Sequence, residues 1–260
     1  REVSMISVIL PVLNEANTIG KIVKQFKGKQ NVGEIIVVDD KSFDETVAEA
    51  KEAGAVVVTS TKLGKGASMR DGFLVSKGEI IVFLDGDVEE YDKNLIDNFV
   101  RPIINDEADF IKASFSREAG RVTELVAKPL LSILFPELVR FSQPLSGMIA
   151  GKREFFEKIK FEDDYGVDIG ILIDMHTTGA RIKEVNLGEI QHKMKSWRQL
   201  GQMSREVSRA ILQRAIKSPF ANLKSLEMIN ILRDQMEFSI KETLLTMKKM
   251  IVFDMDKTVL

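Results

Sequence analysis

The sequence predicts an α/β protein with a mostly parallel sheet, helices on both faces of that sheet and a C-terminal helical region. Short apolar runs alternate with helical patterns over about the first ninety residues. Runs that are apolar throughout are typical of parallel strands buried on both faces. Acidic residues follow several of these runs, at the end of the strands where such sheets bind ligands. These three observations define the fold class.

Four short segments rich in β-branched residues predict four strands. They lie at residues 7–10 (SVIL), 34–38 (EIIVV), 55–59 (AVVVT) and 79–84 (EIIVFL). The segments between them predict helices at residues 17–27, 43–53 and 67–77. Gly54 is a stop signal for the second helix, and the turn Gly64-Lys65-Gly66 opens the third.

The remainder of the chain changes character twice. Residues 91–198 are mixed and contain Gly-rich loops, whereas residues 200–250 have a charged helical pattern that is interrupted at Ser218-Pro219. A further strand is expected at residues 250–253. The domains that we predict are therefore residues 1–199, a helical extension at 200–249 and the start of another domain at 250–260.

Composition excludes several classes of protein. Of the 260 residues, 44% are hydrophobic and 29% are charged, which is the balance of a globular domain. The absence of cysteine excludes disulfides, zinc–thiolate sites and cysteine nucleophiles. The 37 basic residues nearly balance the 39 acidic ones, so binding of nucleic acid through bulk charge is not expected.

The hydropathy pattern predicts a cytoplasmic protein without stable membrane insertion. No segment approaches the roughly 20 apolar residues that span a bilayer. The apolar run at residues 5–13 is short, contains Ser7 and Pro11, and lacks the flanks of a signal peptide. It is therefore interpreted as a buried strand.

The motif Asp85-Gly86-Asp87 is the sharpest chemical signal. It follows the predicted strand 79–84, and Asp39-Asp40 follows the strand 34–38 in the same way. Alternate carboxylates on such a turn can share one divalent cation, because Mg²⁺ binds through one or two carboxylates together with substrate phosphates. The alternative is an ordinary Asp-Gly turn.

Two further segments suit a nucleotide. Residues 11–15 (PVLNE) can face a base and a ribose, with Glu15 accepting a hydroxyl hydrogen bond, although Asn14 or Asn17 could instead cap the next helix. Residues 39–46 (DDKSFDET) can accept from a base or a ribose, although Ser42 could likewise be a helix cap.

The turn Gly64-Lys65-Gly66 offers unhindered backbone and a cation at a helix N-terminus, which suits a diphosphate. A plain flexible loop is the alternative. The turn is not a P-loop, because Gly-x-x-x-x-Gly-Lys-[Ser/Thr] is absent.

These motifs, in this order, resemble the nucleotide-sugar glycosyltransferases of the GT-A fold, which is Rossmann-like. The motif around residues 11–15, V-D-D-x-S-x-D-x-T at 38–46, G-K-G at 64–66 and D-x-D at 85–87 carry the resemblance. Polyprenyl-phosphate sugar transferases share these motifs, so the acceptor stays open at this point.

The middle of the chain resembles the glucosyl-3-phosphoglycerate synthases. The resemblance covers residues 6–204 and rests on GRVTEL at 120–125, KPLL at 128–131, PEL at 136–138, QPLSG at 143–147, YGVDIG at 165–170 and GEIQH at 188–192. It implies metal-dependent, retaining transfer of a hexose from a nucleoside diphosphate sugar to the 2-hydroxyl of 3-phosphoglycerate. The donor (UDP-glucose or GDP-mannose) and the metal (Mg²⁺ or Mn²⁺) stay open.

The resemblance also implies roles for individual residues. Donor binding falls to Pro11, Leu13, Glu15, Asp40, Lys65 and Asp85. Acceptor binding falls to Gly120, Arg121, Val122, Thr123, Gly147 and Tyr165. The metal ligands are Asp87 and His192, and the catalytic residues are Asp85, Asp87 and Asp168. From the residues alone, Arg121 and His192 could equally be solvated surface side chains.

Three positions depart from the family pattern. Lys128 stands where the family has Arg, Asp168 stands where it has Glu, and Met194 replaces a polar residue after the histidine. Asp168 is one methylene shorter than Glu, and Met194 removes a polar partner for the acceptor carboxylate. These departures bear on the assignment of the acceptor.

The last residues resemble the first motif of haloacid-dehalogenase phosphatases, with Asp254 as nucleophile and Asp256 as acid/base. We expect a phosphatase domain to follow the synthase. The helices of residues 200–250 are candidates for pairing into a homodimer. A polyprenyl-phosphate sugar transferase and a non-catalytic nucleotide-sugar-binding module are the two alternative functions.

Overall fold

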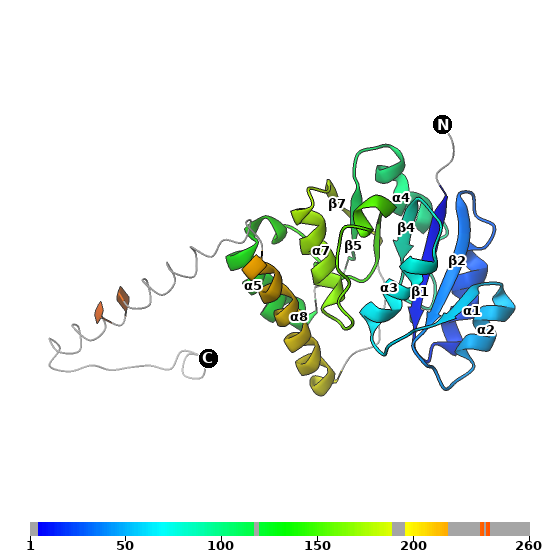
Figure 1. Ribbon diagram of the computed structural model, residues 1–260, viewed down its shortest axis with the longest axis horizontal. Helices are drawn as coiled ribbons and strands as arrows, with labels where there is room; N and C mark the ends of the chain where they lie inside the picture. Colours follow the sequence, from blue (N-terminus) through cyan, green and yellow to red (C-terminus); the bar gives the residue numbers. More distant parts are fainter. Residues whose placement is uncertain (1–4, 117–119, 189–195, 218–234, 237, 240–260) are drawn as a thin grey trace. The chain divides into compact units, whose positions relative to one another are not determined.

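A computed structural model describes residues 5–116, 120–188, 196–217, 235–236 and 238–239. Residues 1–221 form one compact unit and residues 222–260 another. The first unit contains a seven-stranded sheet in the order β3-β2-β1-β4-β6-β5-β7 (Figure 1). The strands are β1 (Ile6–Val12), β2 (Val32–Asp39), β3 (Val56–Thr59), β4 (Ile80–Phe83), β5 (Phe110–Ser114), β6 (Ile149–Lys152) and β7 (Ile182–Asn186). Only β6 among them runs antiparallel to its neighbours, which confirms the predicted mostly parallel sheet.

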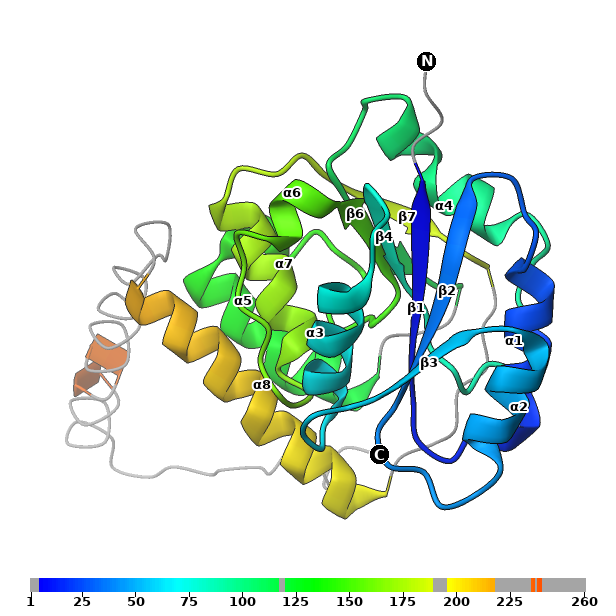
Figure 2. The ribbon, with the colours of Figure 1, turned by 45° about the vertical axis from the view of Figure 1, so that its right-hand side comes forward.

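Helices cover both faces of the sheet, as predicted. Helices α1, α2 and α4 pack on one face, and α3 and α7 pack on the other (Figure 2). Their bounds are α1 (Ala16–Phe26), α2 (Thr46–Ala53), α3 (Lys65–Val75), α4 (Leu95–Ile104), η1 (Thr123–Ala127), α5 (Lys128–Leu134), η2 (Pro136–Leu138), α6 (Arg153–Phe156), α7 (Val167–Thr177) and α8 (Trp197–Lys217).

The continuous apolar runs are explained by two separate cores. Successive side chains of a strand point to opposite faces. Val8 and Leu10 of β1 therefore join the core under α1, α2 and α4, whereas Ile9 joins the core under α3 and α7. Both faces of β1 and β4 are buried, and this leaves only the strand ends for ligands.

Two helices begin at other residues than predicted. Helix α2 begins at Thr46 and not at residue 43, because Asp44 accepts the backbone N–H and the hydroxyl of Thr46 and so initiates the helix there. Helix α3 begins at Lys65, two residues earlier than predicted. Lys65 is therefore the first residue of a helix.

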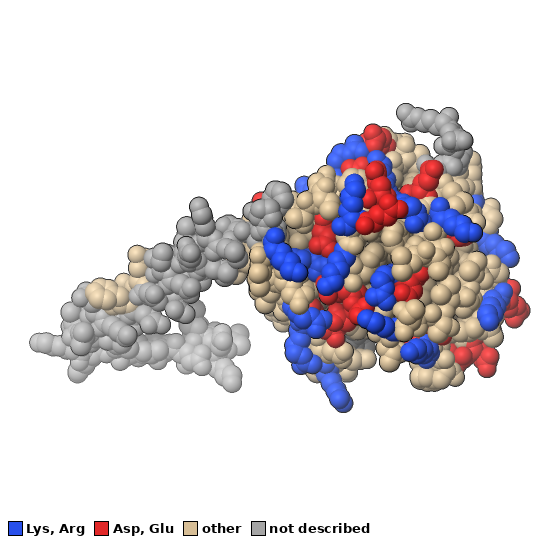
Figure 3. Space-filling model, viewed as in Figure 1, with Lys and Arg blue, Asp and Glu red and all other residues tan. Residues whose placement is uncertain are grey.

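Helix α8 belongs to the first unit. Its buried residues recur at helical spacing, at Val207, Ala210, Ile211, Arg214 and Ala215, and α8 packs on α7 and α5. The predicted domain boundary at residue 199 falls within this helix, and residues 250–260 lie outside the described part of the chain. None of the described helices is long and apolar enough to cross a membrane. Basic and acidic side chains are interspersed on the face shown in Figure 3.

Candidate functional site

The carboxyl ends of β1, β2 and β4 meet at one edge of the sheet, because these strands run parallel. Two hydrogen bonds connect the loop after β1 to the loop after β2. The N–H of Asn14 donates to Ser42 Oγ at 2.9 Å, and the N–H of Glu15 donates to Thr46 Oγ1 at 2.8 Å. Neither α1 nor α2 has a side-chain cap at its N-cap position, so the capping alternatives for Asn14 and Ser42 are wrong. The loops instead bring Leu13, whose side chain is 47% exposed, beside the segment that follows β2.

Asp40 carries an unused acceptor at this edge. Its Oδ2 accepts the N–H of Gly64 at 2.9 Å, whereas Oδ1 is buried and has no hydrogen-bond partner. Burial raises the pKa of Asp40, although the Gly64 N–H opposes the shift. A buried carboxyl oxygen without a donor is costly. Asp40 is therefore suited to accept from an N–H or O–H of a ligand.

The turn Asp85-Gly86-Asp87 is held through its backbone. The hydroxyl of Tyr91 donates to the Asp85 carbonyl at 2.7 Å, and Thr18 Oγ1 donates to the Gly86 carbonyl at 2.6 Å. Burial raises the pKa of Tyr91 above its ordinary value, so its hydroxyl stays protonated and remains a donor. These bonds fix the turn and involve neither carboxylate. Tyr91 and Thr18 were not predicted as site residues, because their hydroxyls contact main-chain atoms of the turn and belong to no motif.

Lys65 lies at the centre of the candidate site. Its Nζ is 3.0 Å from Asp168 Oδ2 and 3.5 Å from Asp85 Oδ1. Burial opposes the charge of Lys65, but Asp168 and Asp85 outweigh burial and raise the pKa of the ammonium. A Cβ atom on Gly147 would lie 2.1 Å from Lys65 Nζ, so a larger residue at this position would displace the ammonium. The fold thus joins four predicted site residues from four separate segments.

Gly66 shows that the turn before α3 is not a plain flexible loop. A Cβ atom on Gly66 would lie 1.8 Å from the carbonyl oxygen of Glu162. The next N–H, of Ala67, donates to the Asp163 carbonyl at 3.0 Å. Glycine is therefore required for close approach of the segment 162–164, and that segment supports the start of α3.

Lys112 lies beneath Asp168 and was not identified in the sequence analysis. Its side chain is 0% exposed, and its Nζ donates to the backbone carbonyl of Asp168 at 3.0 Å. Asp168 is itself 2% exposed, and its Oδ1 has no hydrogen-bond partner. Burial lowers the pKa of Lys112 to about 7, although the attraction of Asp168 opposes this shift.

Four of the predicted acceptor residues, Gly120 to Thr123, lie together at the start of η1. Gly120 and Arg121 are exposed, whereas Val122 and Thr123 are buried. The guanidinium of Arg121 lies 4.6 Å from the ring centroid of Trp197, the first residue of α8. The sequence analysis did not identify Trp197. Residues 123–127 form a π-helix, an irregularity that is frequent at functional sites.

Of the other predicted residues, some make contacts in the structure and some lie outside the described residues. The N–H of Tyr165 donates to Glu206 of α8 at 3.2 Å, which ties the loop before α7 to that helix. Lys128, a departure from the family pattern, pairs with Glu124. His192 and Met194 lie outside the described residues. Within the described ranges, no group of three or more His, Cys, Asp or Glu side chains could hold a metal ion.

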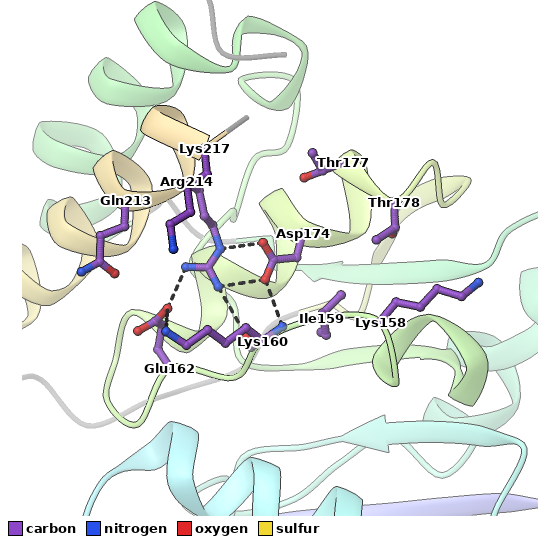
Figure 4. A pocket seen from close by; sticks show the side chains of 10 residues that line it. All are labelled: Lys158, Ile159, Lys160, Glu162, Asp174, Thr177, Thr178, Gln213, Arg214 and Lys217. Atoms are coloured by element: carbon purple, nitrogen blue, oxygen red, sulfur yellow. Dashed lines mark hydrogen bonds and ion pairs between the residues drawn. The ribbon is translucent and has the colours of Figure 1, made fainter. Parts of the chain in front are cut away.

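A separate pocket of about 370 Å³ lies between α8 and the end of α7 (Figure 4). It contains none of the predicted site residues. Arg214 donates there to both carboxylate oxygens of Asp174, at 2.7 and 2.8 Å, and to Glu162 at 2.9 Å. Its guanidinium is therefore saturated, and it fastens α8 to α7 and to the segment that supports α3.

The chain is similar to proteins of known family. Residues 7–163 match the family described as glycosyl transferase family 2. The chain is 36% identical over 233 residues to the glucosyl-3-phosphoglycerate synthase of Mycolicibacterium smegmatis, over 80% of this chain and 77% of that protein. It is also 36% identical to the synthase of Petrotoga mobilis, over 82% of this chain and 74% of that protein.

Solved structures of similar proteins contain ligands. The glucosyl-3-phosphoglycerate synthase of Mycobacterium tuberculosis, in complex with Mn²⁺, UDP-glucose and phosphoglyceric acid, matches with a TM-score of 0.77 and 37% identity. That match covers 82% of this chain and 80% of the other. Another complex of that enzyme contains Mn²⁺, UDP and glucosyl-3-phosphoglycerate, with the same TM-score and 36% identity.

Proposed function

The chain belongs to glycosyl transferase family 2 and, within it, to the glucosyl-3-phosphoglycerate synthases, and we propose that it transfers glucose from UDP-glucose to the 2-hydroxyl of 3-phosphoglycerate. Transfer depends on a divalent metal and retains the anomeric configuration. The observation that carries the proposal is the cluster of Lys65, Asp85 and Asp168 beside the Asp85-Gly86-Asp87 turn. This cluster contains a cation that can bind a diphosphate, and carboxylates that can bind a metal and a sugar.

The donor lies along the carboxyl ends of β1, β2 and β4. Pro11, Leu13 and Glu15 line the nucleoside pocket, with Asp40 accepting from the base or the ribose through its unpartnered Oδ1. Lys65 donates to the diphosphate, and the N-terminus of α3, which begins at this residue, favours the same negative charge. Asp85 contacts the sugar.

A divalent cation fits the carboxylates at this edge. Asp87 would hold it, with Asp85 beside it and His192 as a further ligand. The fit rests on the oxygen donors of a turn whose backbone is fixed by Tyr91 and Thr18. When bound, the metal neutralises the charge that develops on the diphosphate leaving group.

The acceptor phosphate binds at the start of η1. Arg121, whose guanidinium lies over the Trp197 ring, donates to it, and Thr123 and the backbone of Gly120 and Val122 assist. Gly147 and Tyr165 border the sugar and the acceptor. Asp168 orients the reacting hydroxyl.

We further propose that the enzyme is cytoplasmic, does not bind nucleic acid and forms a homodimer. Support for a dimer comes from the exposed apolar side chains of α8, Leu212 and Ile216, on a helix whose other face is buried. The expected phosphatase domain after residue 250 stays a prediction. A lipid acceptor and simple nucleotide-sugar binding are the alternatives that the test below distinguishes.

The test is turnover of UDP-glucose by the full chain with a panel of acceptors. We expect transfer to 3-phosphoglycerate with Mn²⁺ or Mg²⁺, much weaker transfer to glycerate and none in excess EDTA. GDP-mannose as the matched donor should be a poor substrate. Transfer to polyprenyl phosphate alone would establish the first alternative, and donor binding without transfer would establish the second.

A further inference from the structure

Lys112 is a buried cation for which the proposed function has no role. Side chains alternate across β5, so Phe110 and Lys112 point to the face that α7 covers, whereas Ile111 and Ala113 join the opposite core. No part of Lys112 is exposed. Burying an ammonium is unfavourable, and an apolar side chain would fill this layer at lower cost. Packing therefore does not account for a lysine at this position.

The hydrogen bond of Lys112 does not account for it either. Its Nζ donates to the carbonyl oxygen of Asp168, in the first turn of α7. A positive charge near a helix N-terminus opposes the helix dipole. The favourable contributions are the charges of Asp168, Asp85 and Glu184, which attract Lys112 while Lys65 repels it. The attraction of Asp168 is the largest of the three, so a residue of the site is the main partner of Lys112.

Without ligands, Lys65 pairs with both Asp85 and Asp168, and Lys112 donates to the backbone carbonyl of Asp168. A donor diphosphate changes this arrangement, because it competes with Asp168 for Lys65. Asp168 then loses the partner that lies 3.0 Å from its Oδ2, and its Oδ1 has none. Leaving a nearly fully buried carboxylate without a cation is costly, so Asp168 would tend to be displaced. Lys112 is the cation that the diphosphate does not compete for, since it is enclosed beneath α7.

We propose that Lys112 is a positioning residue of the transfer reaction, which holds Asp168 in place while Lys65 contacts the donor diphosphate. This inference rests on the proposed function. It assigns Lys112 no contact with the substrates. Lys112 acts through Asp168, so its removal matters only while Asp168 is present.

The test compares four variants of the full chain with the unmutated enzyme. Lys112→Met removes the charge at similar length, and Lys112→Gln removes the charge but keeps a hydrogen-bond donor. Asp168→Asn and the double variant Lys112→Met/Asp168→Asn complete a double-mutant cycle. Lys183→Met, at an exposed position of β7, is the control. kcat and KM are measured for both substrates, and circular dichroism reports folding.

We expect Lys112→Met and Lys112→Gln each to lower kcat about tenfold or more, as loss of a charge-assisted interaction does. KM for UDP-glucose should stay within about twofold, and Lys112→Met should have no further effect in the Asp168→Asn background. Equal losses in both backgrounds, an unchanged kcat, or loss of the fold in both single variants would overturn the inference. Failure of the unmutated enzyme to use 3-phosphoglycerate would instead overturn the proposed function, and this inference with it.

Discussion

Replacement of Arg121 by alanine should selectively weaken binding of the acceptor. Its guanidinium carbon lies over the Trp197 ring, 4.6 Å from the centroid, and we expect its N–H groups to donate to a phosphate. A hydrogen bond to a charged group contributes about 1.5–3 kcal/mol. KM for 3-phosphoglycerate should therefore rise roughly tenfold to a hundredfold.

The assay is the initial rate at varied 3-phosphoglycerate, with UDP-glucose and Mn²⁺ at saturation. Arg140→Ala is the matched control, because Arg140 also stacks on an aromatic ring, that of Phe141, but has no proposed substrate. The donor affinity of Arg121→Ala, measured by calorimetry, should match that of the unmutated enzyme. We also expect the variant to lose its preference for 3-phosphoglycerate over glycerate.

The chain contains one tryptophan, so its intrinsic fluorescence reports on the Arg121 site directly. Trp197 is 74% exposed, and phosphate binding to the stacked guanidinium should change its emission without any donor present. Arg121→Ala should abolish this change. An unchanged KM for 3-phosphoglycerate, or an equal loss of donor and acceptor affinity, would refute the assignment of Arg121 to the acceptor phosphate.

Two further predictions concern stability. Arg214→Met should lower the free energy of unfolding by about 3–5 kcal/mol, because it leaves the carboxylates of Asp174 and Glu162 without their buried partner. Lys217→Met, in the same pocket, is the control and should change the free energy of unfolding little. Urea unfolding measures both variants. Hydrogen bonds from Arg181 hold the pKa of the Asp109 carboxyl well below its usual value. Its contribution to stability is therefore present above about pH 4 and lost as the pH falls further, so Asp109→Asn should flatten the dependence of unfolding free energy on pH below 4.

The sheet was predictable because its signal is local. Strands buried on both faces are apolar throughout, and parallel strands place their carboxyl ends at one edge, so Asp40 and Asp85 were expected there from the sequence alone. The helix starts were less predictable. The carboxylate of Asp44 accepts the N–H of Thr46, where α2 begins. A pattern of apolar residues does not predict this hydrogen bond.

The charged centre of the site was predictable only in part. Lys65 and Asp168 are 103 positions apart, and resemblance to a family brought them together where spacing could not. Neither spacing nor resemblance to a family indicated Lys112. A single lysine in an apolar strand usually has its ammonium in water, and only the fold shows that this one is enclosed under α7. Trp197 was missed for the opposite reason, because an exposed aromatic residue becomes informative only once Arg121 is found on its face.

Helix α8 links these observations, because it holds the segment on which Lys65 depends. Arg214 bonds Glu162, Arg209 pairs with Asp164, and Glu206 accepts the N–H of Tyr165. This segment lies against the start of α3 at the distance that only glycine at position 66 permits. The same segment leads into Asp168 at the start of α7. Both partners of the ion pair between Lys65 and Asp168 thus depend on a helix that was predicted to be an extension, and we propose that the catalytic unit includes α8.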